Sequence, residues 1–440
     1  MSNLSDLLPS GGGQNIVDFT ASGTVASGKP VILNANGTVT QVAGDSADQA
    51  VGSEVVFESA NIVWSGATFD SSNNKVVFVY RDAGNSGYGT AVVGTPASDN
   101  SITFGTPVVY NSATSDMNAA TFDSSNNKVV IAYDDSGNSN YGTAIVGTVS
   151  GTSISFGSEV VFRSSNSNNI SATFDSSNNK VVIAFRDASG ASGGYGTAIV
   201  GTVSGTSISF GTKQAFNSDN TDPISATFDS NSNKVVIAFK DSSGSNDASA
   251  VVGTVSGTSI SFGSIAQFDS NALSTYASAV FDSSNNKVVI SYRQSSNSYG
   301  KAVVGTVSGT SISFGSPVTV DSGGAAWQSS TFDSNANKVV LCYRDDGNSY
   351  YGTLVVGTVS GTSISFGSEV VFNAASTAYI APTFDSNLNK VVIGYRDQGN
   401  SNYGTGIVFQ VAFSSTNLTA TNFIGLADAA ISNSATGKIN

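Results

Sequence analysis

Two sets of side chains recur at fixed places in this chain and could bind a sugar or a carboxylate. The first set occupies one position near the end of a repeated apolar segment: Arg81, Asp134, Arg186, Lys240, Arg293, Arg344 and Arg396. The second set lies five residues before a repeated Phe: Trp64, Met117, Asn169, Pro223, Tyr276, Trp327 and Tyr379. Exposed aromatic clusters often mark contact surfaces, and Arg donates paired hydrogen bonds to carboxylates. Together the two sets suit a surface that stacks on sugar rings.

The spacing of the two sets predicts that they face each other across a hairpin. If Asp70 pairs with Lys75 across a four-residue turn, Trp64 lies opposite Arg81. The same register gives our candidate ligand-binding residues as the pairs Trp64/Arg81, Tyr276/Arg293, Trp327/Arg344 and Tyr379/Arg396. Two interpretations stay open. The pairs are either cation–π packing between strands, worth about 0.5–1 kcal/mol each, or an arc on one rim that binds a ligand.

The composition excludes several other kinds of site. The 440 residues include no His and a single Cys, Cys342, so His-based catalysis, His metal sites and intrachain disulfides are ruled out. Cys342 stands in an apolar segment and is expected to be a core thiol. The turn after Asp70 lacks the dense carboxylates of a calcium loop, and we expect an Asx turn with a weak ion pair to Lys75. We therefore expect no metal, no cofactor and no catalytic residues.

The charge disfavours partners with negative surfaces. Lys and Arg number 18 against 31 Asp and Glu, a net charge of −13, so nucleic acid and anionic membranes are not expected partners. No apolar run reaches the ~20 residues of a membrane span, and the first residues lack the basic segment of a signal peptide. A glycoside hydrolase would need paired carboxylates, which we do not find in the repeats.

A repeat of 51 to 54 residues positions both sets of side chains. It is marked by Phe-Asp-Ser beginning at Phe69, Phe122, Phe174, Phe228, Phe281, Phe332 and Phe384. Each copy contains four short β-rich segments separated by Asn, Ser and Gly, which favour turns. The second segment is apolar without alternation, as expected for a strand covered on both faces. Seven such copies over residues 51–413 predict an all-β fold, a seven-bladed β-propeller, with an open β-solenoid as the structural alternative.

The two ends of the repeat array indicate how a ring would close. The seventh repeat lacks the fourth segment that follows the third in the other copies. A matching segment, 52–57, stands before the first repeat and is identical to 157–162 and 367–372. The N-terminal strand is therefore predicted to complete the last blade, which covers two exposed sheet edges.

The flanks of the array have a different character. Residues 14–47 and 417–440 are predicted to form one small discontinuous β domain, and residues 1–13 a flexible arm. Within the first flank, residues 30–33 and 38–42 enclose Asn-Ala-Asn-Gly, which favours a hairpin.

The flanks resemble small β domains of tailed-phage virion proteins, both capsid decoration and tail-fibre proteins. The resemblance is carried by the segment 21–33, by Asn-Gly-Thr-Val at 36–39, and by 422–431. The repeat unit also resembles Asn/Ser/Gly-rich repeats of marine phage structural proteins. The resemblance implies a structural role on the virion surface, many copies on one particle, and no catalytic residues.

These observations lead to three hypotheses about function. The first is a non-enzymatic virion surface protein that displays the propeller, with other virion proteins and copies of itself as partners and adhesion to host-surface glycans as a candidate role. The second is a glycan-binding, lectin-type propeller. The third and least favoured is a propeller glycoside hydrolase.

Overall fold

The computed structural model describes residues 17–42, 44–189, 194–242, 246–270, 273–416, 423–426, 430–432 and 434–439. The chain separates into two compact units, one made of residues 1–48 and 412–440 and the other of residues 49–411. The described residues are all-β and contain one short 3₁₀ turn, η2 (Ser136–Asn138), and no α-helix. No described helix is long and apolar enough to cross a membrane. The flexible arm predicted for residues 1–13 lies outside the described residues.

The second unit is built from antiparallel four-stranded groups, and repeat 2 shows the pattern. The second half of β10 (Val108–Asp123) pairs with β11 (Lys128–Asp135), which pairs with β12 (Tyr141–Ser150). One end of β12 pairs with β13 (Ser153–Phe156) and its other end with the start of β14 (Val160–Asp175). The fourth position of each group is thus shared by a short strand and the beginning of a long one. The long strand then continues as the first strand of the next repeat.

The other repeats follow this plan. Their strands are β5 (Ala50–Val51), β6 (Val55–Asp70), β7 (Lys75–Asp82), β8 (Tyr88–Pro96), β9 (Ile102–Phe104), β15 (Lys180–Asp187), β16 (Tyr195–Ser204), β17 (Ser207–Phe210), β18 (Gln214–Asp229), β19 (Lys234–Asp241), β20 (Asp247–Ser256), β21 (Ser259–Phe262), β22 (Ala266–Asp269), β23 (Leu273–Asp282), β24 (Lys287–Gln294), β25 (Gly300–Ser308), β26 (Ser311–Phe314), β27 (Val318–Asp321), β28 (Ala325–Asp333), β29 (Lys338–Asp345), β30 (Tyr351–Ser360), β31 (Ser363–Phe366), β32 (Val370–Asp385), β33 (Lys390–Asp397) and β34 (Tyr403–Gln410). Pairing is not continuous through all of them, because β23 to β27 form a separate five-stranded sheet.

Local chemistry explains the hairpin at the start of each repeat. Asp70 is buried, and its Oδ1 accepts hydrogen bonds from the backbone amides of Ser72 and Asn73 at 2.9 and 3.0 Å, which is the predicted Asx turn. Asn74 closes the turn with a φ of 53°. The predicted register, Asp70 opposite Lys75, is confirmed. The second strand is buried on both faces, as in β7, because apolar side chains from neighbouring groups cover it.

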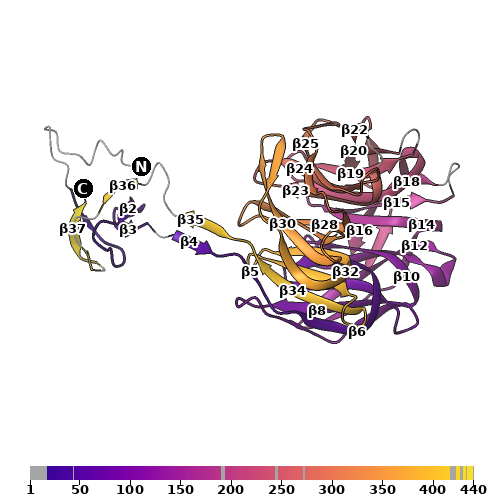
Figure 1. Cartoon of the computed structure of the whole chain (residues 1–440), viewed down its shortest axis with the longest axis horizontal. Helices are drawn as coiled ribbons and strands as arrows, with labels where there is room; N and C mark the ends of the chain where they lie inside the picture. The colour runs from indigo at the N-terminus through magenta and orange to yellow at the C-terminus, as the bar shows by residue number, and fades with distance from the viewer. Residues whose placement is uncertain are drawn as a thin grey trace. The chain divides into compact units, whose positions relative to one another are not determined.

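The N-terminal strand pairs beside the last repeat, as predicted. The start of β6 pairs with β34 in antiparallel register, with Val56 opposite Thr405, and β5 extends the pairing at Phe409. In Figure 1 the indigo β6 and the yellow β34 accordingly lie together. The core clusters lie between consecutive repeats, and one cluster joins Phe57 and Phe78 of the first repeat to Val392 and Val408 of the seventh.

The first strand of each repeat contacts its counterparts in cyclic order. These inner strands are β6, β10, β14, β18, β23, β28 and β32; each contacts the next, and β32 contacts β6. They bring to one centre residues that are up to three hundred positions apart in sequence. This arrangement positions the site described below.

The first unit combines strands from both chain ends. β1 (Val17–Thr20) pairs with β37 (Thr436–Ile439), and β36 (Phe423–Leu426) pairs with β2 (Pro30–Leu33). β2 also pairs with β3 (Val39–Gln41) in the hairpin predicted at Asn-Ala-Asn-Gly. β4 (Gly44–Ala47) pairs with β35 (Phe413–Thr416).

Candidate functional site

A β-bulge shifts the predicted register of the aromatic residues. Arg81 lies opposite Val63, not Trp64, and regular pairing resumes with Gly66 opposite Val79. Two residues of β6 therefore face one residue of β7. The pairings Trp64/Arg81, Trp327/Arg344 and Tyr379/Arg396 are wrong as cross-strand partners, because each of these arginines lies opposite the residue before the aromatic one. In the fifth repeat Tyr276 and Arg293 both lie within a larger register shift, between the pairs Leu273–Gln294 and Ala277–Tyr292.

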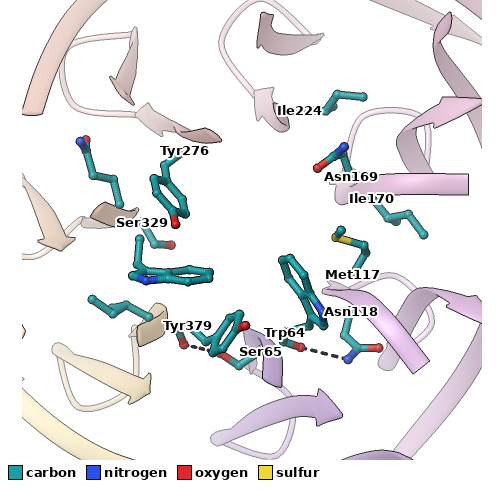
Figure 2. Close-up of a pocket in the computed structure, with 13 residues that line it drawn as sticks. Trp64, Ser65, Met117, Asn118, Asn169, Ile170, Ile224, Tyr276, Ser329 and Tyr379 are labelled. Carbon is teal, nitrogen blue, oxygen red and sulfur yellow. Dashed lines mark hydrogen bonds between the residues drawn. The ribbon is translucent and has the colours of Figure 1, made fainter. Parts of the chain in front are cut away.

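The bulge gives the aromatic positions an unusual backbone. Positive φ angles of 50–55° occur at Trp64, Met117, Asn169, Trp327 and Tyr379. Such angles are uncommon for bulky residues and cost free energy unless the surroundings hold them. A bulge re-aims the side chain it carries, and here the side chains project from the inner strands into a central space (Figure 2).

The re-aimed side chains line a pocket of about 210 Å³. Every inner strand contributes to it: the lining is Trp64, Ser65, Met117, Asn118, Asn169, Ile170, Ile224, Tyr276, Trp327, Gln328, Ser329, Tyr379 and Ile380. The pocket is of a size to hold a small ligand or the end of a larger one.

The four predicted aromatic residues meet in one wall of this pocket. The ring centroids of Trp327 and Tyr379 are 4.2 Å apart, and those of Tyr276 and Trp327 are 4.9 Å apart. Trp64 contacts Tyr379 edge-on at 5.4 Å. The repeats that carry them are the first, fifth, sixth and seventh, so this wall depends on contact between the two ends of the array. The aromatics form one packed cluster instead of separate cross-strand pairs.

The lining also contains polar side chains next to the bulge positions. Asn118 Nδ2 donates to the carbonyl oxygen of Trp64 at 2.9 Å, and its Oδ1 accepts from the hydroxyl of Tyr110 at 2.7 Å. Ser65 donates to the carbonyl oxygen of Tyr379. These bonds tie neighbouring inner strands together at the bulges (Figure 2). Neither Asn118 nor Ser65 was predicted from the sequence, although each directly follows a predicted position.

Two buried polar groups in the lining have no hydrogen-bond partner. They are the indole Nε1 of Trp327, a donor, and the side-chain Oε1 of Gln328, an acceptor. Gln328 is only 5% exposed. A buried polar atom left unsatisfied costs about 1–3 kcal/mol, so a ligand that bonds to it removes an existing penalty.

Most of the predicted arginines are held by carboxylates outside the pocket lining. Arg81 pairs with Asp116 of the next repeat, and Arg186 pairs with Asp222 at 3.5 Å. The arginines of the fifth and sixth repeats share one carboxylate, that of Asp346, with Arg293 at 3.2 Å and Arg344 at 2.7 Å.

Only one of the four predicted cation–π contacts is present among the described residues. The guanidinium of Arg396 lies 4.6 Å from the ring centroid of Tyr379. Arg344 instead lies 5.1 Å from the ring of Tyr350, a residue of the loop before β30. Trp327 packs against the rings of Tyr276 and Tyr379 instead.

Asp134 occupies the position where the other six repeats carry Arg or Lys, and its protonation provides a prediction about stability. Burial, with Asp116 and Asp135 nearby, raises its pKa from 3.8 to about 7. The unfolded chain releases this proton first, so the contribution of Asp134 to stability falls as pH rises from about 4 to 7 and is constant above that. We expect Asp134→Asn to stabilise the protein at pH 8 by about 1 kcal/mol, allowing for solvent screening, and to have little effect below pH 4.

Urea unfolding of both proteins at several pH values measures this effect. The difference in unfolding free energy between Asp134→Asn and wild type should grow between pH 4 and pH 7. A difference that stays constant with pH would show that Asp134 is ionised normally in the folded protein.

Comparison with known proteins does not assign the chain to a family. No protein-family model matches the chain, and no curated protein matches it. Conclusions about function therefore rest on the residues and their arrangement.

Proposed function

We propose that this protein is a non-enzymatic seven-bladed β-propeller that binds carbohydrate in the aromatic pocket at the centre of its ring. The observation that carries the proposal is the convergence of Trp64, Tyr276, Trp327 and Tyr379 on one pocket wall, in a lining that also contains amide and hydroxyl side chains. Aromatic faces pack against the C–H faces of a sugar, while amides and hydroxyls suit its hydroxyl groups. No carboxylate lines the described pocket, which favours binding over hydrolysis.

Several contacts between the first and last repeats support a closed ring of seven blades. The start of β6 pairs with β34, Ser65 donates to Tyr379, and Lys390 of the seventh repeat donates to Asn100 Oδ1 of the first. Each inner strand contacts its neighbour in cyclic order. Where β23 to β27 form a separate sheet, packing of the inner strands continues the ring.

Hydrogen exchange tests ring closure directly. Residues 55–58 pair with β34 as residues 160–163 pair with β12, so their amides should be equally protected. Rapid exchange at 55–58 with slow exchange at 160–163 would contradict a closed ring.

A glycan array tests carbohydrate binding. We expect the wild-type protein to bind a defined subset of glycans, with the same subset recovered by calorimetry on free oligosaccharides. Absence of binding to every neutral and acidic glycan on the array would reject the proposal. Release of product from a bound glycan over hours would favour the hydrolase alternative.

A second proposal concerns where the protein acts. Both chain ends contribute strands to one unit, separate from the repeats, and its residues carry the resemblance to small β domains of phage virion proteins. We propose that this unit attaches the protein to a virion surface, in many copies, so that weak binding at each propeller is multiplied. Mass spectrometry of purified particles from the virus that encodes the protein should detect it at high copy number, and its absence from those particles would reject the proposal.

A further inference from the structure

Positive charge gathers on the side of the pocket where the aromatic residues lie. The four repeats that carry the aromatic wall, the first, fifth, sixth and seventh, each carry one arginine at the same position of the second strand: Arg81, Arg293, Arg344 and Arg396, which lie outside the lining of the described pocket. Two carboxylates pair with them, Asp116 with Arg81, and Asp346 with both Arg293 and Arg344. Four positive and two negative charges leave an excess of two positive charges, in a chain whose net charge is −13.

The other side of the ring has no such excess. There the corresponding strands carry Asp134, Arg186 and Lys240, and Arg186 is paired with Asp222. Two positive groups therefore accompany two carboxylates. Because of this charge difference, a negative group is more favourable beside the aromatic wall than beside the second, third and fourth repeats.

Arg396 is the least compensated of the four arginines. Among the described residues no carboxylate lies within ion-pair distance of it, and its Nε is buried without a hydrogen-bond partner. Burial lowers its pKa, and the nearby Arg344 acts in the same direction. The guanidinium of Arg396 contacts the ring of Tyr379, which itself lines the pocket.

Nearby carboxylates are committed to other bonds. Asp397, the next residue of β33, accepts the amides of Gly399 and Asn400 at 2.9 and 3.2 Å and the side chain of Asn373. Asp346 is already shared by two arginines. Arg396 therefore has donors available to a group that the chain itself does not supply.

We propose that the ligand is an acidic sugar, a pyranose carrying a carboxylate, and that Arg396 binds this carboxylate while the ring packs against the Tyr379–Trp327 wall. This inference rests on the proposed carbohydrate-binding function and narrows it to one chemical class. The pocket volume of about 210 Å³ suits one terminal sugar residue. A carboxylate beside Arg396 offsets the excess positive charge. Its hydrogen bonds to the guanidinium are charge-assisted, and such bonds are stronger than those between neutral groups.

Matched pairs of sugars test the inference on the full-length protein. Calorimetry would compare methyl glucoside with methyl glucuronide, and methyl galactoside with methyl galacturonide, at low and high salt. We expect at least one acidic member to bind about ten-fold more tightly than its neutral counterpart, with the preference reduced at high salt. Sodium acetate is the probe for a carboxylate without a sugar, and it should bind far more weakly.

Arg396→Gln should remove this preference, so that the acidic and neutral members of each pair bind with affinities within about two-fold of each other. The matched control is Arg186→Gln, which changes the equivalent arginine on the side without aromatics and should keep the preference. Thermal unfolding of each variant confirms that it is folded.

The outcomes separate the two proposals. Equal affinity for neutral and acidic sugars, or a preference that survives in Arg396→Gln, would overturn the inference while carbohydrate binding stands. Acetate binding as tightly as the acidic sugars would point to a simple anion site and also overturn it. No binding of any sugar, here or on the array, would overturn both.

Discussion

Gly52→Ala is expected to destabilise the protein by about 3 kcal/mol, although Gly52 stands before the first repeat and the change adds one methyl group. A Cβ at Gly52 would lie 2.0 Å from the carbonyl oxygen of Asn100 in the first repeat. The obstacle is backbone, which a side-chain movement cannot relieve. Urea unfolding of the wild-type and variant proteins measures the loss.

The hexapeptide at 52–57 recurs at 157–162 and 367–372, and the first glycine of each copy provides a matched control. Gly157→Ala meets the carbonyl oxygen of Thr206 in the next repeat at 1.8 Å and should cost as much as Gly52→Ala. Gly367→Ala meets nothing closer than 3.8 Å, because the seventh repeat lacks the corresponding turn, and should change stability by less than about 0.5 kcal/mol. If Gly52→Ala instead resembled Gly367→Ala, the N-terminal segment would not be seated against the first repeat.

Trp327→Ala is expected to weaken glycan binding by at least about 30-fold, the effect of losing roughly 2 kcal/mol at a central contact residue. Trp327 lines the pocket and contacts the rings of Tyr276, Tyr379 and Trp64, and its buried Nε1 has no hydrogen-bond partner among the described residues. Its removal takes away both the stacking surface and the donor. Calorimetry with a glycan identified on the array measures the change.

Two variants distinguish loss of contact from loss of structure. Trp327→Phe keeps a ring in the cluster but lacks the donor, and should give intermediate affinity with a melting temperature near that of wild type. Met117→Ala changes the same bulge position in the second repeat and should retain affinity within about three-fold. Unchanged binding by folded Trp327→Ala would show that the aromatic wall is not the binding surface.

The repeat pattern predicted most of the local structure, because its signals are short-range. The turn after Asp70 depends on a side chain bonding to amides two and three residues away, and the register across it follows. The apolar second strand indicated coverage on both faces, which β7 has. The identity of residues 52–57 with 157–162 likewise predicted that the N-terminal strand pairs beside the last repeat.

The sequence identified the four aromatic residues that line the pocket. The predicted register was wrong, because it placed Trp64 opposite Arg81. The β-bulge that separates Trp64 from Arg81 has no strong local signal, since Trp, Met, Asn and Tyr all occupy it with positive φ. The roles of Asn118 and Gln328 were also missed, because they depend on which strand lies next in the ring and not on neighbours in sequence.

Sequence alone therefore determined the strands, their turns and the pairing of the N-terminal segment, each of which depends on hydrogen bonds or apolar patterns within a few residues. Tertiary structure decided which way the aromatic side chains point and that four of them meet. That outcome follows from the packing of the inner strands in cyclic order, which holds a strained backbone at Trp64, Trp327 and Tyr379 and brings Trp64 against Tyr379 across the contact between the first and last repeats.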